Sequence, residues 1–343
     1  MNARRGDRLW LGLLFVLLVA TTVASIRYGA MDFSTRDMAD AAWGKLSGRA
    51  DLSLDQRIFV NLRVPRALLC LFVGACLGVG GALMQALFRN PIVEPGLVGT
   101  SSGAAFGASL FYVFGALLKT NFGGWTLPLA ACAGGVLSTY LVFALAHTKH
   151  EGRSSILRLL LTGLAINALF MSGIGFLSYV ARDPAARSII YWNLGTLSGA
   201  DWNSVLVVGL AAIGGLIPAI IFAKPLNALM IGEDEATALG VNVRRLKWMV
   251  LTINVLMVAV ATAFTGVISF VGLIVPHILR IVRGPDNRFL IPGSALLGGI
   301  LLSIADVIAR VSLRPAELPI GIVTAVVGVP VFLSLLRSGD YLP

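Results

Sequence analysis

The chain has 343 residues, of which 57% are hydrophobic and 13% are charged, and its formal net charge is +10. A soluble protein of this length cannot bury so much apolar surface, so the composition predicts an all-α protein that crosses a membrane many times. The basic residues lie mostly between apolar runs, where they set the orientation of helices, so we expect contact with membrane lipid and no nucleic-acid partner.

The first apolar run, residues 9–26, follows a basic N-terminus. It is longer than the apolar region of a signal peptide, so we predict an uncleaved first transmembrane helix. Residues 27–61 form the longest polar stretch. We expect this stretch to carry a short amphipathic helix outside the membrane.

Further apolar runs bring the expected total to about ten transmembrane helices, each close to the ~20 residues that a crossing needs. They lie at residues 64–87, 97–118, 125–146, 156–180, 205–222, 248–267, 270–282, 290–309 and 320–336. The run at 270–282 is short for a full crossing. Gly74 and Gly78, four residues apart, predict a close approach between two helices. We interpret residues 1–343 as a single transmembrane domain.

Lys and Arg side chains indicate the orientation of this array. If both termini are cytoplasmic, the larger share of these side chains falls on the cytoplasmic side, as the positive-inside rule requires. The same alternation places the polar residues 224–247 in the cytoplasm.

Residues 224–247 form a polar insert between two apolar runs. Glu233, Asp234 and Glu235 suit the positive end of a helix dipole, and Gly240 suits a left-handed cap at the end of that helix. We therefore predict two short helices that are joined at Gly232 and stop at Gly240. A solvated connecting loop is the alternative.

Motifs for catalysis and metal binding do not occur in the sequence. The chain has no Gly-x-x-x-x-Gly-Lys-Ser/Thr motif, so it cannot hold nucleotide phosphates in that way. Its histidines and cysteines show no metal-ligand spacing. We predict no catalytic residue, no metal site and no permanently bound cofactor. A membrane enzyme would need a cluster of catalytic side chains, and none stands out.

Asp306 lies inside a predicted span, where an unpaired carboxylate costs about 3 kcal/mol. Arg310 follows one helical turn later, so we favour an Asp306–Arg310 ion pair over a proton relay. An ion-coupled secondary transporter, the alternative class of function, would need several such groups. Asn254 is expected to pack between helices, whereas Asn167 could either pack or line a wet pathway.

Six sequence blocks carry a resemblance to a known family. They are residues 63–66 (RVPR), 80–91 (GGALMQALFRNP) and 99–104 (GTSSGA), then Gly232 with Ala236, Ala238, Leu239 and Gly240, then residues 270–280 (FVGLIVPHILR) and residues 317–321 leading to 328–332. With these blocks the chain resembles the permease subunit of type II ABC importers. That family moves ferric siderophores, haem and cobalamin through the bacterial inner membrane.

The resemblance implies a homodimer with the pathway between its two copies, two ATP-binding subunits and a periplasmic substrate-binding protein. ATP would be used by the partner subunit, so this chain would not itself be an enzyme. The polar insert would supply coupling helices that dock on the ATP-binding subunit. The residues assigned to this contact are Gly232, Glu233, Asp234, Glu235, Ala236, Leu239 and Gly240.

Arginines on the outer face of this family pair with glutamates of the binding protein. By position, the candidates here are Arg63, Arg66 and Arg310. Arginines at helix ends also extend toward the headgroups without any partner, which is the alternative for all three. For Arg310 the docking role competes with the Asp306 pair.

The cargo is expected to be haem, an iron porphyrin, with a ferric siderophore or cobalamin as alternatives. Residues 95–99, 192–202, 284–288 and 315–319 resemble haem permeases more than siderophore permeases. Candidate pathway residues in one predicted span would suit a flat porphyrin, although such side chains more often face the core or lipid. They are Asn167, Phe170, Met171, Phe176 and Tyr179.

Overall fold

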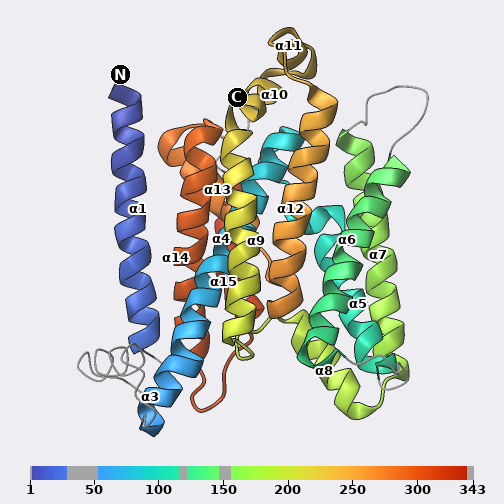
Figure 1. The fold of residues 1–343 in the computed structure, drawn as a ribbon. Helices are drawn as coiled ribbons and strands as arrows, with labels where there is room; N and C mark the ends of the chain where they lie inside the picture. The colour runs from blue at the N-terminus through green and yellow to red at the C-terminus, as the bar shows by residue number, and fades with distance from the viewer. Residues whose placement is uncertain (1, 29–52, 116–121, 147–155, 338–343) are drawn as a thin grey trace.

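A computed structural model describes residues 2–28, 53–115, 122–146 and 156–337 as a bundle of helices (Figure 1). Each predicted span is matched by one helix, and no strand occurs within these ranges. The helices are α1 (Asn2–Arg27), α4 (Val64–Phe88), α5 (Thr100–Phe114), α6 (Thr126–Ala146), α7 (Ile156–Val180), α9 (Trp202–Ile221), α12 (Val243–Thr265), α13 (Val271–Arg283), α14 (Asn287–Val311) and α15 (Ile320–Arg337). The predicted all-α membrane fold is confirmed.

Shorter elements join these helices. They are α3 (Leu54–Ile58), the π-helix η1 (Phe59–Arg63), the 3₁₀ turns η2 (Pro95–Val98) and η3 (Gly123–Trp125), and the helices α8 (Asp183–Asn193), α10 (Ala223–Ile231) and α11 (Glu233–Ala238). Of the amphipathic helix expected within residues 27–61, only α3 and η1 fall within the described chain. Residues 29–52 lie outside it.

Membrane-spanning length is reached by 7 helical segments of the described chain, and α5, α13 and α15 are shorter. The 13 residues of α13 rise about 20 Å, less than the ~30 Å of a bilayer core, as its short apolar run predicts.

Helix α4 forms the core of the bundle, because most of its residues are buried on all sides. Gly74 and Gly78 make the close approach that their spacing predicts. A Cβ added to Gly74 would clash with the backbone carbonyl of Gly298, and one added to Gly78 with that of Ser294. The backbones of α4 and α14 are therefore in contact and pack as one rigid pair.

Several helices begin elsewhere than hydropathy predicts, because the residue just before the helix, through its side chain or its backbone conformation, decides where it starts. Helix α12 begins at Val243 and not at residue 248, since the Asn242 side chain accepts a hydrogen bond from the Arg245 N–H at 3.0 Å. The last residues of the polar insert therefore belong to α12. Helix α5 begins only after Gly99, whose φ of +87° ends the 3₁₀ turn η2.

Helix α8 was not expected from the sequence. It has Pro184 in its first turn, and it buries Ile189 and Trp192 while Ile190 and Tyr191 stay exposed. Figure 1 shows α8 at the same end of the bundle as α3. The start of α1 lies at the opposite end, together with α10 and α11. This arrangement agrees with the predicted orientation, in which the N-terminus and the polar insert share one side.

Candidate functional site

The polar insert folds into two short helices, α10 and α11, joined by Gly232. Gly232 has extended backbone angles, φ 171° and ψ 161°, and so separates the two helices. After α11, the Val241 N–H donates to the Ala236 carbonyl and the Gly240 N–H to the Thr237 carbonyl, both at 2.9 Å. This Schellman motif, with Gly240 at φ +83°, ends the helix. The two predicted short helices are therefore present, and the alternative of a solvated connection without a docking role is tested by charge reversal in α11.

The exposed surface of α11 combines acidic and apolar side chains at the tip of the bundle (Figure 1). Asp234 and Glu235 are exposed, whereas Glu233 is half-buried and its carboxylate pairs with the Lys247 Nζ at 2.7 Å. Leu239 is 68% exposed, and Ile231, just before the joint, is 70% exposed. Large exposed apolar side chains beside a polar rim are typical of a docking surface.

At the other end of the bundle, Asp306 binds two arginines. It is fully buried, and its Oδ1 lies 2.9 Å from the Arg66 Nη2. Its Oδ2 lies 2.8 Å from the Arg310 Nε, so the predicted Asp306–Arg310 ion pair is confirmed. Arg66 also pairs through Nη1 with Glu317, at 2.9 Å. We call Arg66, Asp306, Arg310 and Glu317 the ion-pair network.

The ion-pair network affects the three predicted docking arginines differently. Arg310 is almost completely buried, and its guanidinium also donates to the carbonyl oxygens of Ser25 and Tyr28, each at 2.9 Å. Docking through Arg310 would require it to leave these partners. Arg63 lies nearer the surface than Arg310, and its Nη1 donates to the Tyr28 carbonyl at 3.2 Å. The docking role stays a prediction. Arg63 is the best residue for testing it, because it lies outside the ion-pair network.

We expect Arg63→Glu to weaken docking of the cognate binding protein by about tenfold at low salt, with a smaller effect at high salt, because exposed charges steer association and are screened. The measurement is the Kd between the purified chain, in detergent or nanodiscs, and the binding protein that the resemblance implies, over a range of ionic strength. Arg244→Glu, at the opposite end of the bundle, is the control and should leave that Kd unchanged. An unchanged Kd for Arg63→Glu would show that Arg63 does not contact the binding protein and only extends toward the lipid headgroups.

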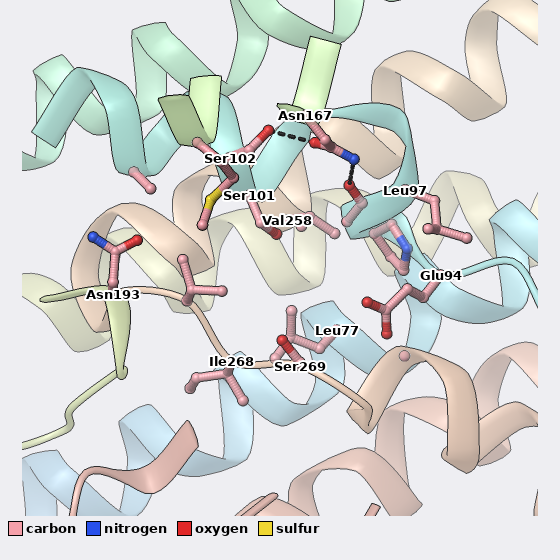
Figure 2. A pocket seen from close by; sticks show the side chains of 16 residues that line it. Leu77, Glu94, Leu97, Ser101, Ser102, Asn167, Asn193, Val258, Ile268 and Ser269 are labelled. Atoms are coloured by element: carbon pink, nitrogen blue, oxygen red, sulfur yellow. Dashed lines mark hydrogen bonds between the residues drawn. The ribbon is translucent and has the colours of Figure 1, made fainter. Parts of the chain in front are cut away.

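A cavity of about 350 Å³ with a mixed apolar and polar wall, which we call the polar cavity, opens between α5, α7 and the breaks in helix before α5 (residues 89–99) and before α13 (residues 266–270) (Figure 2). Its wall contains six polar side chains, and no Lys, Arg or His is among the described residues that line it. The six are Glu94, Ser101, Ser102, Asn167, Asn193 and Ser269. The apolar part of the wall includes Leu77, Val258, Ile268 and Met171.

Asn167 both lines the cavity and holds its wall together. Its Nδ2 donates to the Gly96 carbonyl at 3.2 Å, and its Oδ1 accepts from the Ser102 hydroxyl, as the dashed lines in Figure 2 show. The Glu94 carboxylate points toward the cavity (Figure 2) and accepts from the Phe270 N–H at 3.3 Å. The breaks before α5 and α13 are thereby linked.

The other candidate pathway residues lie in different surroundings. Met171 reaches the polar cavity, but Phe170 lines a separate apolar pocket, where its ring packs at a tilt against that of Phe106 with the ring centroids 5.2 Å apart. Phe176 and Tyr179 are largely exposed on α7. The sequence analysis did not identify Glu94 or Asn193 as cavity residues. The available signals were the Pro-rich break around Glu94 and, for Asn193, the stretch 192–202 that resembles haem permeases.

The polar cavity can make several weak contacts with a solute that passes through it. Hydroxyl, amide and carboxylate groups can exchange hydrogen bonds with a passing solute, and a pathway must release what it binds. Among the described residues, no group of three or more His, Cys, Asp or Glu side chains could hold a metal ion. Asn254 of α12 is fully buried, and neither its Oδ1 nor its Nδ2 has a hydrogen-bond partner among the described residues.

Comparison with known proteins gives consistent results. The model of the FecCD transport family matches residues 17–338. The hemin transport system permease protein HmuU of Yersinia pestis is 38% identical over 341 residues, which cover 98% of this chain and 97% of HmuU. The vitamin B12 import system permease protein BtuC of Salmonella typhimurium is also 38% identical, over 97% of this chain and 96% of BtuC.

Solved structures agree with these relatives. A metal-chelate type ABC transporter in an inward-facing conformation matches with a TM-score of 0.82 and 31% identity, covering 96% of this chain and 98% of its own. PsaBC from Streptococcus pneumoniae matches with a TM-score of 0.53 and 17% identity, over 87% of this chain and 94% of its own. The second likeness concerns the fold alone.

Proposed function

The chain belongs to the FecCD transport family, and from this premise we propose that it is the permease subunit of an ATP-driven importer of haem in a bacterial inner membrane. The observation that carries the proposal is the match along almost the whole chain to permeases of such importers. The multi-pass bundle and the protruding α10–α11 element are the parts that such a subunit needs.

The proposed partners are a second copy of the chain, two ATP-binding subunits and a periplasmic binding protein. The chain has no phosphate-binding loop of its own, so ATP hydrolysis is assigned to the partner subunit. Helix α11 supports this assignment because it presents Asp234, Glu235 and Leu239 to solvent beyond the ends of the spans. These side chains would insert into a groove of the ATP-binding subunit and transmit its movement.

Haem is the cargo that we propose, and two features of α5 and α7 support it. The apolar pocket that contains Phe106 and Phe170 would suit the face of a porphyrin ring. The polar cavity, which is separate from this pocket, would exchange hydrogen bonds with polar groups of the cargo at another point of its passage. Cobalamin stays an alternative, because the cobalamin permeases match this chain at the same identity as the haem permease. A ferric siderophore is the other alternative within the same machinery.

An ion-coupled secondary transporter fits the structure less well. Asp306 is the acid within a transmembrane helix that the sequence offers for carrying a proton or sodium ion, but Arg66 and Arg310 already pair with it. With both carboxylate oxygens in contact with arginines, Asp306 fits a structural ion pair better than a site that binds and releases an ion.

Uptake of haem, cobalamin and one ferric hydroxamate, each with its own binding protein, tests the proposed cargo. We expect ATP-driven accumulation of haem and uptake of the other two near the rate of empty vesicles. Faster uptake of cobalamin or of the siderophore would overturn the haem assignment and leave the importer class in place.

A further inference from the structure

Besides the hydrogen bond from the Asn287 Nδ2 to the Met230 Sδ at 3.1 Å, helix α10 is tied to the start of α14 by the side chain of Asn227. Its Oδ1 accepts from the Asn287 N–H at 2.9 Å and from the Asn287 Nδ2 at 2.8 Å. Its own Nδ2 donates to the Asp286 Oδ1 at 2.7 Å. Both functional groups of one amide are thus used between two segments about sixty residues apart in sequence. We call Asn227, Asp286 and Asn287 the clamp.

The clamp is rigid because Asp286, its member just before α14, is also held in place. Asp286 caps α14 by accepting from the Arg288 N–H at 2.9 Å, and its carboxylate pairs with the Arg288 guanidinium. The hydrogen bond from Arg288 lowers the pKa of Asp286 to about 2, so this carboxylate stays ionised at neutral pH. Asn287 is fully buried, which leaves its side chain no solvent to bind in place of Asn227.

Helix α14 connects the clamp to the far side of the bundle. It begins at Asn287 and carries Asp306 and Arg310 of the ion-pair network near its other end. Between these ends it packs backbone to backbone on α4 at Gly298. A movement of α14 along its axis would therefore be transmitted across the bundle without being absorbed by flexible side chains.

We infer that Asn227 is a positioning residue that transmits force between the coupling helices and α14, so that docking at the outer face and ATP hydrolysis at the inner face act on one rigid element. The inference rests on the proposed function, since it gives α10 a role in coupling to an ATP-binding subunit. Helix α11 makes the contact with that subunit, and the clamp carries the displacement into the bundle.

Asn227→Ala in the complete complex tests this inference, because alanine removes all three hydrogen bonds of the clamp and leaves the exposed surface of α11 intact. We expect stimulation of ATPase activity by the loaded binding protein to fall about fivefold or more, within the usual range of coupling between sites. Basal ATPase activity and the amount of co-purified ATP-binding subunit should stay as in the wild type.

Asn242→Ala is the matched control. It makes the same chemical change in the same insert, but Asn242 caps α12 and makes no hydrogen bond to α14. It should retain the stimulation. Asn227→Ala with wild-type stimulation would overturn the inference, as would loss of the ATP-binding subunit, which would make Asn227 part of the docking contact. If the loaded binding protein does not stimulate the ATPase activity of the wild-type complex, the result contradicts the proposed function itself, and with it the inference about Asn227.

Discussion

Asp306→Ala is expected to lower the free energy of unfolding by about 3–5 kcal/mol, because it leaves Arg66 and Arg310 as buried cations without their shared carboxylate. The side chain of Arg310 is only 4% exposed and that of Arg66 only 14%, so water cannot replace the lost partner. Unfolding of the purified permease in mixed micelles with increasing denaturing detergent measures the loss.

The double variant Asp306→Leu/Arg310→Leu is the control. It removes the carboxylate together with its nearest cation and leaves Arg66 paired with Glu317. Apolar replacement of a buried ion pair is often neutral or stabilising, so the double variant should recover at least about 1 kcal/mol relative to Asp306→Ala. Equal losses in the two variants would show that an unpaired buried charge is not the cause.

Reversing the three acids of α11, as Glu233→Lys/Asp234→Lys/Glu235→Lys, should reduce ATP-driven uptake at least about tenfold, because reversed charges at an interface cost several kcal/mol. Positive side chains are also unfavourable at the positive end of a helix dipole. Uptake and the amount of co-purified ATP-binding subunit are the two measurements. Membrane insertion should be unaffected, since these residues lie outside the spans.

Lys247→Ala separates the docking charges from the local ion pair. It breaks the 2.7 Å pair with Glu233 but leaves Asp234 and Glu235 in place on the exposed face of α11. An ion pair of this exposure contributes at most about 1 kcal/mol, so uptake should stay within about twofold of the wild type. Unaltered uptake in the triple variant would exclude a coupling role for these acids.

The sequence alone predicted the helices well and their ends less well. Long apolar runs have one stable conformation in a bilayer, because every backbone polar group must be bonded within the segment. Helix ends depend on single residues, through a capping side chain or a backbone angle, and a hydropathy pattern does not show these effects. Asn242 starts α12 ahead of its apolar run, and Gly99 delays α5. Helix α8 was missed because it is short and amphipathic and has no apolar run.

In the candidate sites, contacts between residues close in sequence could be predicted, and contacts between distant segments could not. The Asp306–Arg310 pair was predictable, since four residues on a helix bring side chains together. The third partner, Arg66, comes from α4 and is separated from Asp306 by most of the chain, and no local pattern shows that contact. The same applies to the clamp between Asn227 and Asn287 and to Glu94 in the polar cavity.

The most direct test is uptake of haem into proteoliposomes that enclose ATP, with the loaded binding protein outside. We expect accumulation when the ATP-binding subunit is present. The chain alone should show neither uptake nor ATPase activity, with or without an ion gradient. Substantial uptake by the chain alone would contradict the assignment to an ATP-driven importer.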